Sequence, residues 1–178
     1  MNISNLVSCF CIFMLYGWKS SEACNGYSIK LNHAKNCMTG GVITFAGDSN
    51  VVLDKDCNLA MAGCVEITKD FATHKVKYTI NKAPMPPIEG EADACEVVKN
   101  IKDATLLSAL KTFSVPLECP IKAEKICSTL DNKVNIGKYK NQLGMAAGTI
   151  DVKVESTHDS GKSCLEMNFT LAKEKRAG

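Results

Sequence analysis

The sequence lacks the charge pattern of a nucleic-acid-binding protein. Its formal net charge is only +2 over 178 residues, and no basic stripe with interleaved aromatic side chains is present. Beyond residue 23 it also lacks Cys-x2-Cys and His-x3-His pairs, so the common structural zinc sites are excluded. We therefore expect no nucleic acid, no metal and no cofactor.

Histidines are few, and none lies in a convincing catalytic motif. The contiguous His158, Asp159 and Ser160 cannot place a base between a nucleophile and an acid in space, and they are better explained as a turn. Gly47, Asp48 and Ser49 resemble part of a lipase motif but also suit a turn. A hydrolase would need Ser, His and Asp from distant segments. We expect no enzymatic activity.

An apolar segment long enough to span a bilayer is missing as well. Residues 6–18 form a nearly continuous apolar run of 13 residues, which matches a signal-peptide core and is too short for a membrane span. Ser21 and Ala23 supply the small residues of a cleavage site, although residues 1–5 carry no Lys or Arg. We predict a signal peptide at 1–23, one domain at 24–172 and a polar tail at 173–178. The protein should be secreted, or reach the lysosome by the same pathway, with no integral membrane segment.

Cysteine is plentiful in the predicted mature chain. The even number of cysteines after a signal peptide indicates a disulfide framework. The eight are Cys24, Cys37, Cys57, Cys64, Cys95, Cys119, Cys127 and Cys164. Eight cysteines allow 105 pairings, and these rules do not choose among them. A glycosylation sequon begins at Asn168.

Alternating apolar and polar residues predict a mostly β protein. The apolar positions of the clearest segments are Val76, Tyr78 and Ile80; Ile150, Val152 and Val154; and Leu165, Met167, Phe169 and Leu171. The turn at 158–162 joins the last two segments into a long hairpin. Glu166, Asn168 and Thr170 must then face water, on the side away from Met167 and Phe169.

The middle of the chain follows a different pattern. Pro84, Pro86 and Pro87 form a stiff extended stretch, and apolar residues then recur at helical spacing over 91–113. We predict a single helix there, closed by Pro116 and Pro120. The fold class is therefore mostly β, an immunoglobulin-like two-sheet sandwich or cup with one central helix.

The inward-facing residues also include Phe45 and Met61. The space between the two sheets can be interpreted in two ways. Two apolar sheet faces either pack into a filled core or leave a slot for a ligand. Met and aromatic side chains line adaptable pockets, but they fill cores equally well. Periodicity does not distinguish the two.

The C-terminal half resembles a known family. Cys119-Pro120-Ile121-Lys122 is followed by Lys138-Tyr139, a strand at 149–155, a polar turn, and Ser163-Cys164-Leu165-Glu166. This order resembles the ML (lipid-recognition) superfamily, particularly its ganglioside-activator-like branch and secreted arthropod members. The resemblance implies a two-sheet cup that holds a lipid tail between its sheets without catalytic residues. It also implies a Cys24–Cys164 disulfide, because the first and last family cysteines usually pair.

The remaining disulfides are predicted from position. Cys95–Cys119 would hold together both ends of the helical segment, Cys57–Cys64 would join near neighbours, and Cys37–Cys127 follows by elimination.

The sequence thus predicts a secreted, non-enzymatic lipid-binding or lipid-presenting protein that holds an acyl chain, sterol or glycolipid. The predicted contacts are Phe45, Met61, Val76, Tyr78, Ile80, Ile150, Val152, Val154, Leu165, Met167 and Phe169. Met167 and Phe169 should line the slot opposite Val76, Tyr78 and Ile80. The partner is a lipid or other small hydrophobic ligand, and a receptor or enzyme partner is also open. The alternative is a secreted disulfide-rich interaction protein with a filled core, such as a receptor accessory, venom or salivary factor.

Overall fold

The computed structural model describes residues 23–173, which form ten strands and a few short helical segments. The strands are β1 (Tyr27–Asn36), β2 (Ile43–Phe45), β3 (Asn50–Leu53), β4 (Asn58–Ile67), β5 (His74–Asn81), β6 (Ile88–Asp93), β7 (Glu124–Ser128), β8 (Lys133–Asn135), β9 (Gly148–His158) and β10 (Gly161–Lys173). The helical segments are η1 (Ala23–Gly26), α2 (Ala94–Lys99), α3 (Ala104–Thr112), η2 (Gly137–Gln142) and α4 (Leu143–Ala146). None of the helices in this range is long and apolar enough to cross a bilayer. The signal peptide and polar tail that the sequence predicts lie almost wholly outside the described residues.

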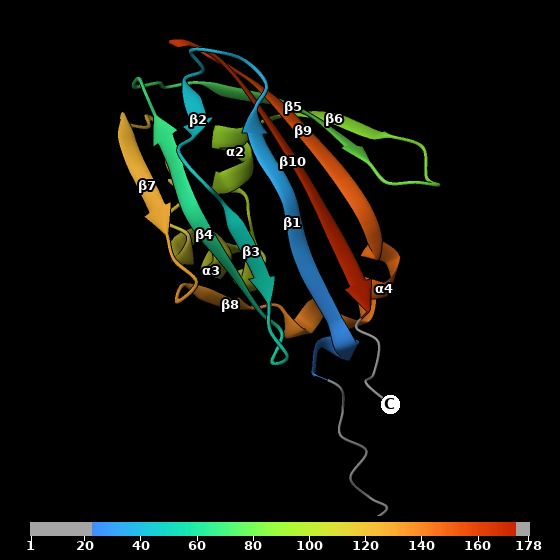
Figure 1. Ribbon diagram of the computed structural model, residues 1–178. Coiled ribbons are helices and arrows are strands. Elements are labelled where there is room, and N and C mark those ends of the chain that lie inside the picture. Colours follow the sequence, from blue (N-terminus) through green and yellow to red (C-terminus); the bar gives the residue numbers. More distant parts are fainter. Residues whose placement is uncertain (1–22, 174–178) are drawn as a thin grey trace, which may run out of the picture.

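The larger sheet is antiparallel and has the strand order β1-β10-β9-β5-β6 (Figure 1). Its register confirms that the alternating apolar residues of β5, β9 and β10 share one face, because directly paired residues point to the same side. Two of the rows across these strands are Tyr78, Val154, Leu165 and Ile80, Val152, Met167. The predicted β9–β10 hairpin is therefore confirmed. Val76, Tyr78 and Ile80 do not lie opposite Met167 and Phe169, however, since β5 belongs to the same sheet as β10.

The other face of β10 is polar, as predicted. Glu166 pairs with Lys35 at 2.9 Å, Asn168 donates a hydrogen bond to Asp151, and the Thr170 hydroxyl lies 3.2 Å from that of Thr149. These groups are satisfied across neighbouring strands and form the outer surface of the larger sheet.

The smaller sheet is built around β4. Strands β2 and β3 follow each other along one side of β4, and β7 and β8 follow each other along the other side. Strand β1 lies beside β3, which closes one long side of the sandwich. On the opposite side α2 contacts β5 and β6, and α3 contacts β8, so helices rather than strands span that gap (Figure 1). The result is a two-sheet β fold with a helical side.

The prediction of one helix over 91–113 is wrong. Its first residues belong to β6, and the rest divides into α2 and α3. The break comes at Asp103, whose carboxylate accepts hydrogen bonds from the backbone N–H groups of Thr105 and Leu106 and so begins a new helix. The same carboxylate accepts hydrogen bonds from Lys138 at 2.6 Å and Tyr139 at 2.8 Å. These charged and polar donors lower the pKa of Asp103 well below its usual range.

Four disulfides connect the strands, and only Cys95–Cys119 matches the predictions. The bonds are Cys24–Cys57, Cys37–Cys164, Cys64–Cys127 and Cys95–Cys119. The predicted Cys24–Cys164 bond is wrong because β1 and β10 are antiparallel. The start of β1 therefore lies beside the end of β10, and it is Cys37, after β1, that meets Cys164 with a Cα–Cα distance of 5.0 Å.

The predicted Cys57–Cys64 and Cys37–Cys127 bonds are wrong as well. Cys57 precedes β4 and Cys64 lies within it, so about 23 Å of extended chain separates them at about 3.3 Å per residue. That distance is far beyond the reach of a disulfide. Cys64 instead lies directly opposite Cys127 on β7, with a Cα–Cα distance of 4.1 Å.

Many of the buried apolar residues gather in two separate clusters. One cluster contains Cys24, Leu53, Cys57, Leu143 and Leu171, and the other contains Val42, Ile67 and Phe71. Most of the inner-face residues of the larger sheet that the sequence singled out are only half-buried, and Ile150 and Leu171 are the buried exceptions. The inner face of the larger sheet is thus less completely buried than the two clusters.

Candidate functional site

A cavity of about 250 Å³ lies between the smaller sheet and the helical side of the protein. Its sixteen lining residues come from β2, β4, β7, α2, the first residue of β5, Phe71 and segment 113–121. We call it the helix-side cavity. The wall on the side of the smaller sheet includes Ile43, Ile67 and Ile126, and the part of the wall formed by α2 includes Ala94 and Val98.

Segment 113–121 forms the outer wall and is fixed at two points within it and at a third just beyond its end. Its Cys119 is bonded to Cys95 on α2. Ile121 and Phe71 exchange two backbone hydrogen bonds of 2.8 and 3.0 Å, which makes a short antiparallel bridge. Just beyond it, the Asp70 carboxylate accepts a hydrogen bond from the backbone N–H of Ala123 at 2.7 Å. Because these ties are covalent or hydrogen-bonded, the cavity wall is held in place without belonging to a helix or strand.

Few polar side chains line the cavity. Glu118 is its only charged residue and His74 its only other titratable side chain, since Cys95 and Cys119 are bonded to each other. Glu118 is exposed, and no Lys or Arg of residues 23–173 forms an ion pair with it. The remaining surface is aliphatic or aromatic, which suits an apolar ligand.

A histidine pair lies at one wall of the cavity, which His74 itself lines. The His74 and His158 rings lie 4.6 Å apart between centroids, and Phe71 packs against both. The Nε2 atom of His74 lies 3.1 Å from the Ser156 hydroxyl, and that of His158 lies 3.0 Å from the Ser163 hydroxyl. β5, β9 and β10 bring these residues together from positions far apart in the sequence.

Both histidines are held in their neutral form at neutral pH. Burial, reinforced by the neighbouring His74, lowers the pKa of His158 to about 4, against the opposing influence of Asp159 and the backbone of Thr73. Burial also lowers the pKa of His74, and Asp93 opposes this shift. The cavity wall therefore carries no positive charge at neutral pH.

The two Ser–His pairs do not make a catalytic triad. No carboxylate within residues 23–173 is hydrogen-bonded to either ring, so a third group that would orient the base is missing there. Ser163 is 3% exposed, and its hydroxyl already accepts a hydrogen bond from the backbone N–H of Ile43. A buried, occupied hydroxyl is poorly placed to attack a substrate.

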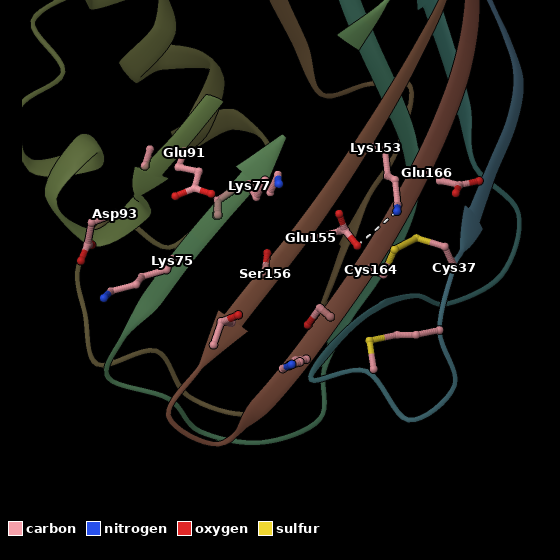
Figure 2. Close-up of a pocket in the computed structure, with 16 residues that line it drawn as sticks. Cys37, Lys75, Lys77, Glu91, Asp93, Lys153, Glu155, Ser156, Cys164 and Glu166 are labelled. Atoms are coloured by element: carbon pink, nitrogen blue, oxygen red, sulfur yellow. Dashed lines mark ion pairs between the residues drawn. A yellow bond between two sulfur atoms is a disulfide. The ribbon is translucent and has the colours of Figure 1, made fainter. Parts of the chain in front are cut away.

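A larger hollow of about 910 Å³ lies on the outer face of the larger sheet, and it is charged rather than apolar (Figure 2). Figure 2 shows lysines and carboxylates side by side on β5, β6, β9 and β10. Lys75 lies opposite Asp93 and Lys77 opposite Glu91 in the strand register, and Lys153 pairs with its strand neighbour Glu155 at 3.1 Å. Such a self-compensated, open surface is an ordinary solvated sheet face and a poor container for an apolar ligand.

None of the eleven predicted contact residues lines the helix-side cavity. Ile80 and Ile150 line a second hollow of about 360 Å³ near α4, where Met85, Ile88 and Met145 are exposed. Val76 borders the larger, charged hollow on the outer face of the larger sheet. The others are half-buried. Their role as lipid contacts stays a prediction.

Comparison with known proteins finds one curated relative. The chain is 28% identical over 158 residues to the Sporozoite-associated mosquito saliva protein 1 of Anopheles gambiae. The alignment covers 86% of each protein. No family model matches the chain. The resemblance to the ML superfamily therefore stays a prediction, whereas similarity to an arthropod saliva protein is a finding.

The sequence interpretation missed the residues that form the cavity's outer wall. Phe113, Val115, Leu117 and Ile121 are closely spaced apolar residues in a stretch that also contains two prolines. The two prolines predict the end of a helix, and Pro120 also belongs to the family-like motif, but neither interpretation assigns this stretch to a cavity wall. Apolar side chains so dense in a stretch unsuited to helix or strand indicate a segment that faces inward, and that signal could have located the site.

Proposed function

We propose that this protein is a secreted, non-enzymatic carrier that holds the apolar tail of a lipid-like ligand in the helix-side cavity. The observation that carries the proposal is the cavity itself, about 250 Å³ in volume and lined almost entirely by apolar side chains. An apolar ligand gains about 0.8 kcal/mol for each methylene group moved from water into such a site.

Three further observations support this function. The four disulfides are typical of proteins folded in the secretory pathway. The order of motifs in the C-terminal half resembles a lipid-binding superfamily. Neither Ser–His pair offers an accessible nucleophile, which favours binding over catalysis.

A pair of variants on α2 tests the proposal. Ala94 lines the cavity, so Ala94→Phe should fill it, whereas Val97 on the same helix is 49% exposed and Val97→Phe adds its ring outside. Isothermal titration calorimetry with octanol should show binding to the wild-type protein and to Val97→Phe, and lost binding to Ala94→Phe. Far-UV circular dichroism must show that both variants are folded. Equal octanol binding by all three proteins, or no binding by the wild type, would contradict the proposed site.

The second candidate is an interaction protein that acts outside the cell. It is favoured by the relative, whose name describes association of a mosquito saliva protein with sporozoites. A rigid, disulfide-linked surface suits such a role as readily as a cavity does. Retained binding to a cell surface by the folded Ala94→Phe variant would separate this activity from ligand binding.

A further inference from the structure

The size of the helix-side cavity restricts which ligand it takes. A water molecule occupies about 30 Å³ in the liquid, and a methylene group is of similar size, so 250 Å³ holds about eight such units. One short chain fills this space. The rigid rings of a sterol or the second tail of a two-chain lipid would have to remain outside.

The charge at the cavity restricts the head group. Glu118 is the only charged residue among the sixteen that line it, and it is exposed. No cation of residues 23–173 is close enough to neutralise it in an ion pair. A head group left at the surface while its tail fills the cavity therefore lies near an uncompensated negative charge.

The other titratable side chain of the lining supplies no charge that would reverse this preference. His74 is neutral at neutral pH, because burial lowers its pKa. Its Nε2 atom is already within 3.1 Å of the Ser156 hydroxyl. A fatty carboxylate thus finds neither a cation to pair with nor a free donor on this ring nitrogen.

We propose that the helix-side cavity selects a single-tailed cationic amphiphile with about eight tail carbons, whose head group pairs with Glu118. This selectivity rests on the proposed function and adds the ligand's class to it. Neutral alcohols of the same length bind less tightly, and carboxylates bind least tightly. Two unit charges about 4 Å apart in water change an affinity about fivefold. We therefore expect about a fivefold difference between cationic and neutral head groups, and about a fivefold difference between neutral and anionic ones.

Calorimetry at pH 7.5 with octylamine, octanol and octanoate tests the head-group preference. The wild type should bind them in that order of decreasing affinity, and Glu118→Gln should bring the three affinities together. Glu124→Gln is the matched control, since Glu124 is exposed on β7, does not line the cavity and carries the same charge. Equal affinities in the wild type, or an unchanged order in Glu118→Gln, would overturn the preference.

A series of alcohols tests the size of the cavity. Affinity should rise about fourfold with each added methylene up to about eight carbons and then level off. A rise that continues undiminished to dodecanol would overturn the size limit. If the wild type binds octanol but the head-group order fails, this inference falls while the proposed function stands. If the wild type binds no octanol, both fall.

Discussion

Acidification should destabilise this protein through the histidine pair. His158 is 5% exposed, and its pKa falls from 6.5 in the unfolded chain to about 4 in the fold because burial disfavours the charged ring. Since the folded pKa is the lower one, the neutral ring stabilises the fold fully above pH 6.5. This contribution is lost as the pH falls from about 6.5 to about 4.

The magnitude follows from the size of that shift. At 1.36 kcal/mol per pKa unit, a displacement from 6.5 to about 4 corresponds to about 3 kcal/mol. Solvent screening reduces this free energy, because the charged hollow on the outer face of the larger sheet brings water close to Ser156 and Ser163, the hydrogen-bond partners of the two rings. We expect about 1 to 2 kcal/mol of acid-dependent free energy of unfolding from His158.

Urea unfolding of the wild type and of His158→Gln, followed by circular dichroism from pH 7.5 to pH 4.5, measures this contribution. Gln keeps a polar group near Ser163 but does not titrate. The free energy of unfolding should therefore fall less steeply with acid in the variant. Carboxylates such as Asp54, whose pKa is lowered to about 2 by hydrogen bonds from Asn58, affect both proteins alike and cancel in the difference.

The control is His33→Gln, since His33 is exposed on β1 and takes no part in the cluster. This variant should depart from the wild-type pH curve less than His158→Gln does. Parallel curves for the wild type and His158→Gln would show that the buried ring does not govern the acid response, and the argument from burial would be wrong.

Three other predictions concern packing, covalent structure and modification. Gly90→Ala should lower the free energy of unfolding, measured in urea, by about 1 to 3 kcal/mol, because a Cβ at this position would collide with the Tyr78 ring. In a Tyr78→Leu background the same substitution should lower it by less. Replacing Cys95 and Cys119 together by Ala should lower the free energy of unfolding by about 3.5 kcal/mol, according to the chain-entropy model for their separation of 24 residues. The double variant should also bind octanol more weakly. Unchanged thermal unfolding would contradict this prediction. Protein secreted from insect cells should lose glycan mass on glycosidase treatment, and Asn168→Gln should abolish that loss.

Local periodicity determined how far the strands could be predicted. A strand turns alternate side chains to opposite faces, so the sequence alone assigned Met167 and Phe169 to one side of β10 and Glu166 to the other. The hairpin of β9 and β10 followed in the same way, because its two strands are adjacent in the chain. The mostly β class and the disulfide framework likewise needed only composition and spacing.

The helical region shows where periodicity is insufficient. Residues 91–113 carry apolar side chains at helical spacing, but α2 ends at Lys99 with Asn100 as its C-cap, and Asp103 begins a separate helix. Its capping role is local, yet Lys138 and Tyr139, which fix its carboxylate, come from a distant part of the chain. The sequence pattern could not show that contact.

Which strands become neighbours was decided only by the tertiary structure. The antiparallel pairing of β1 with β10 brings Cys37 to Cys164 and separates Cys24 from it, although the cysteine count and spacing allow either bond. A second long-range pairing, of β5 with β9, places His74 opposite His158. The helix-side cavity also depends on contacts between distant segments, since the Cys95–Cys119 bond and the bridge from Phe71 turn segment 113–121 into a wall. Alternation is a property of one strand, whereas a cavity is a property of the elements that surround it.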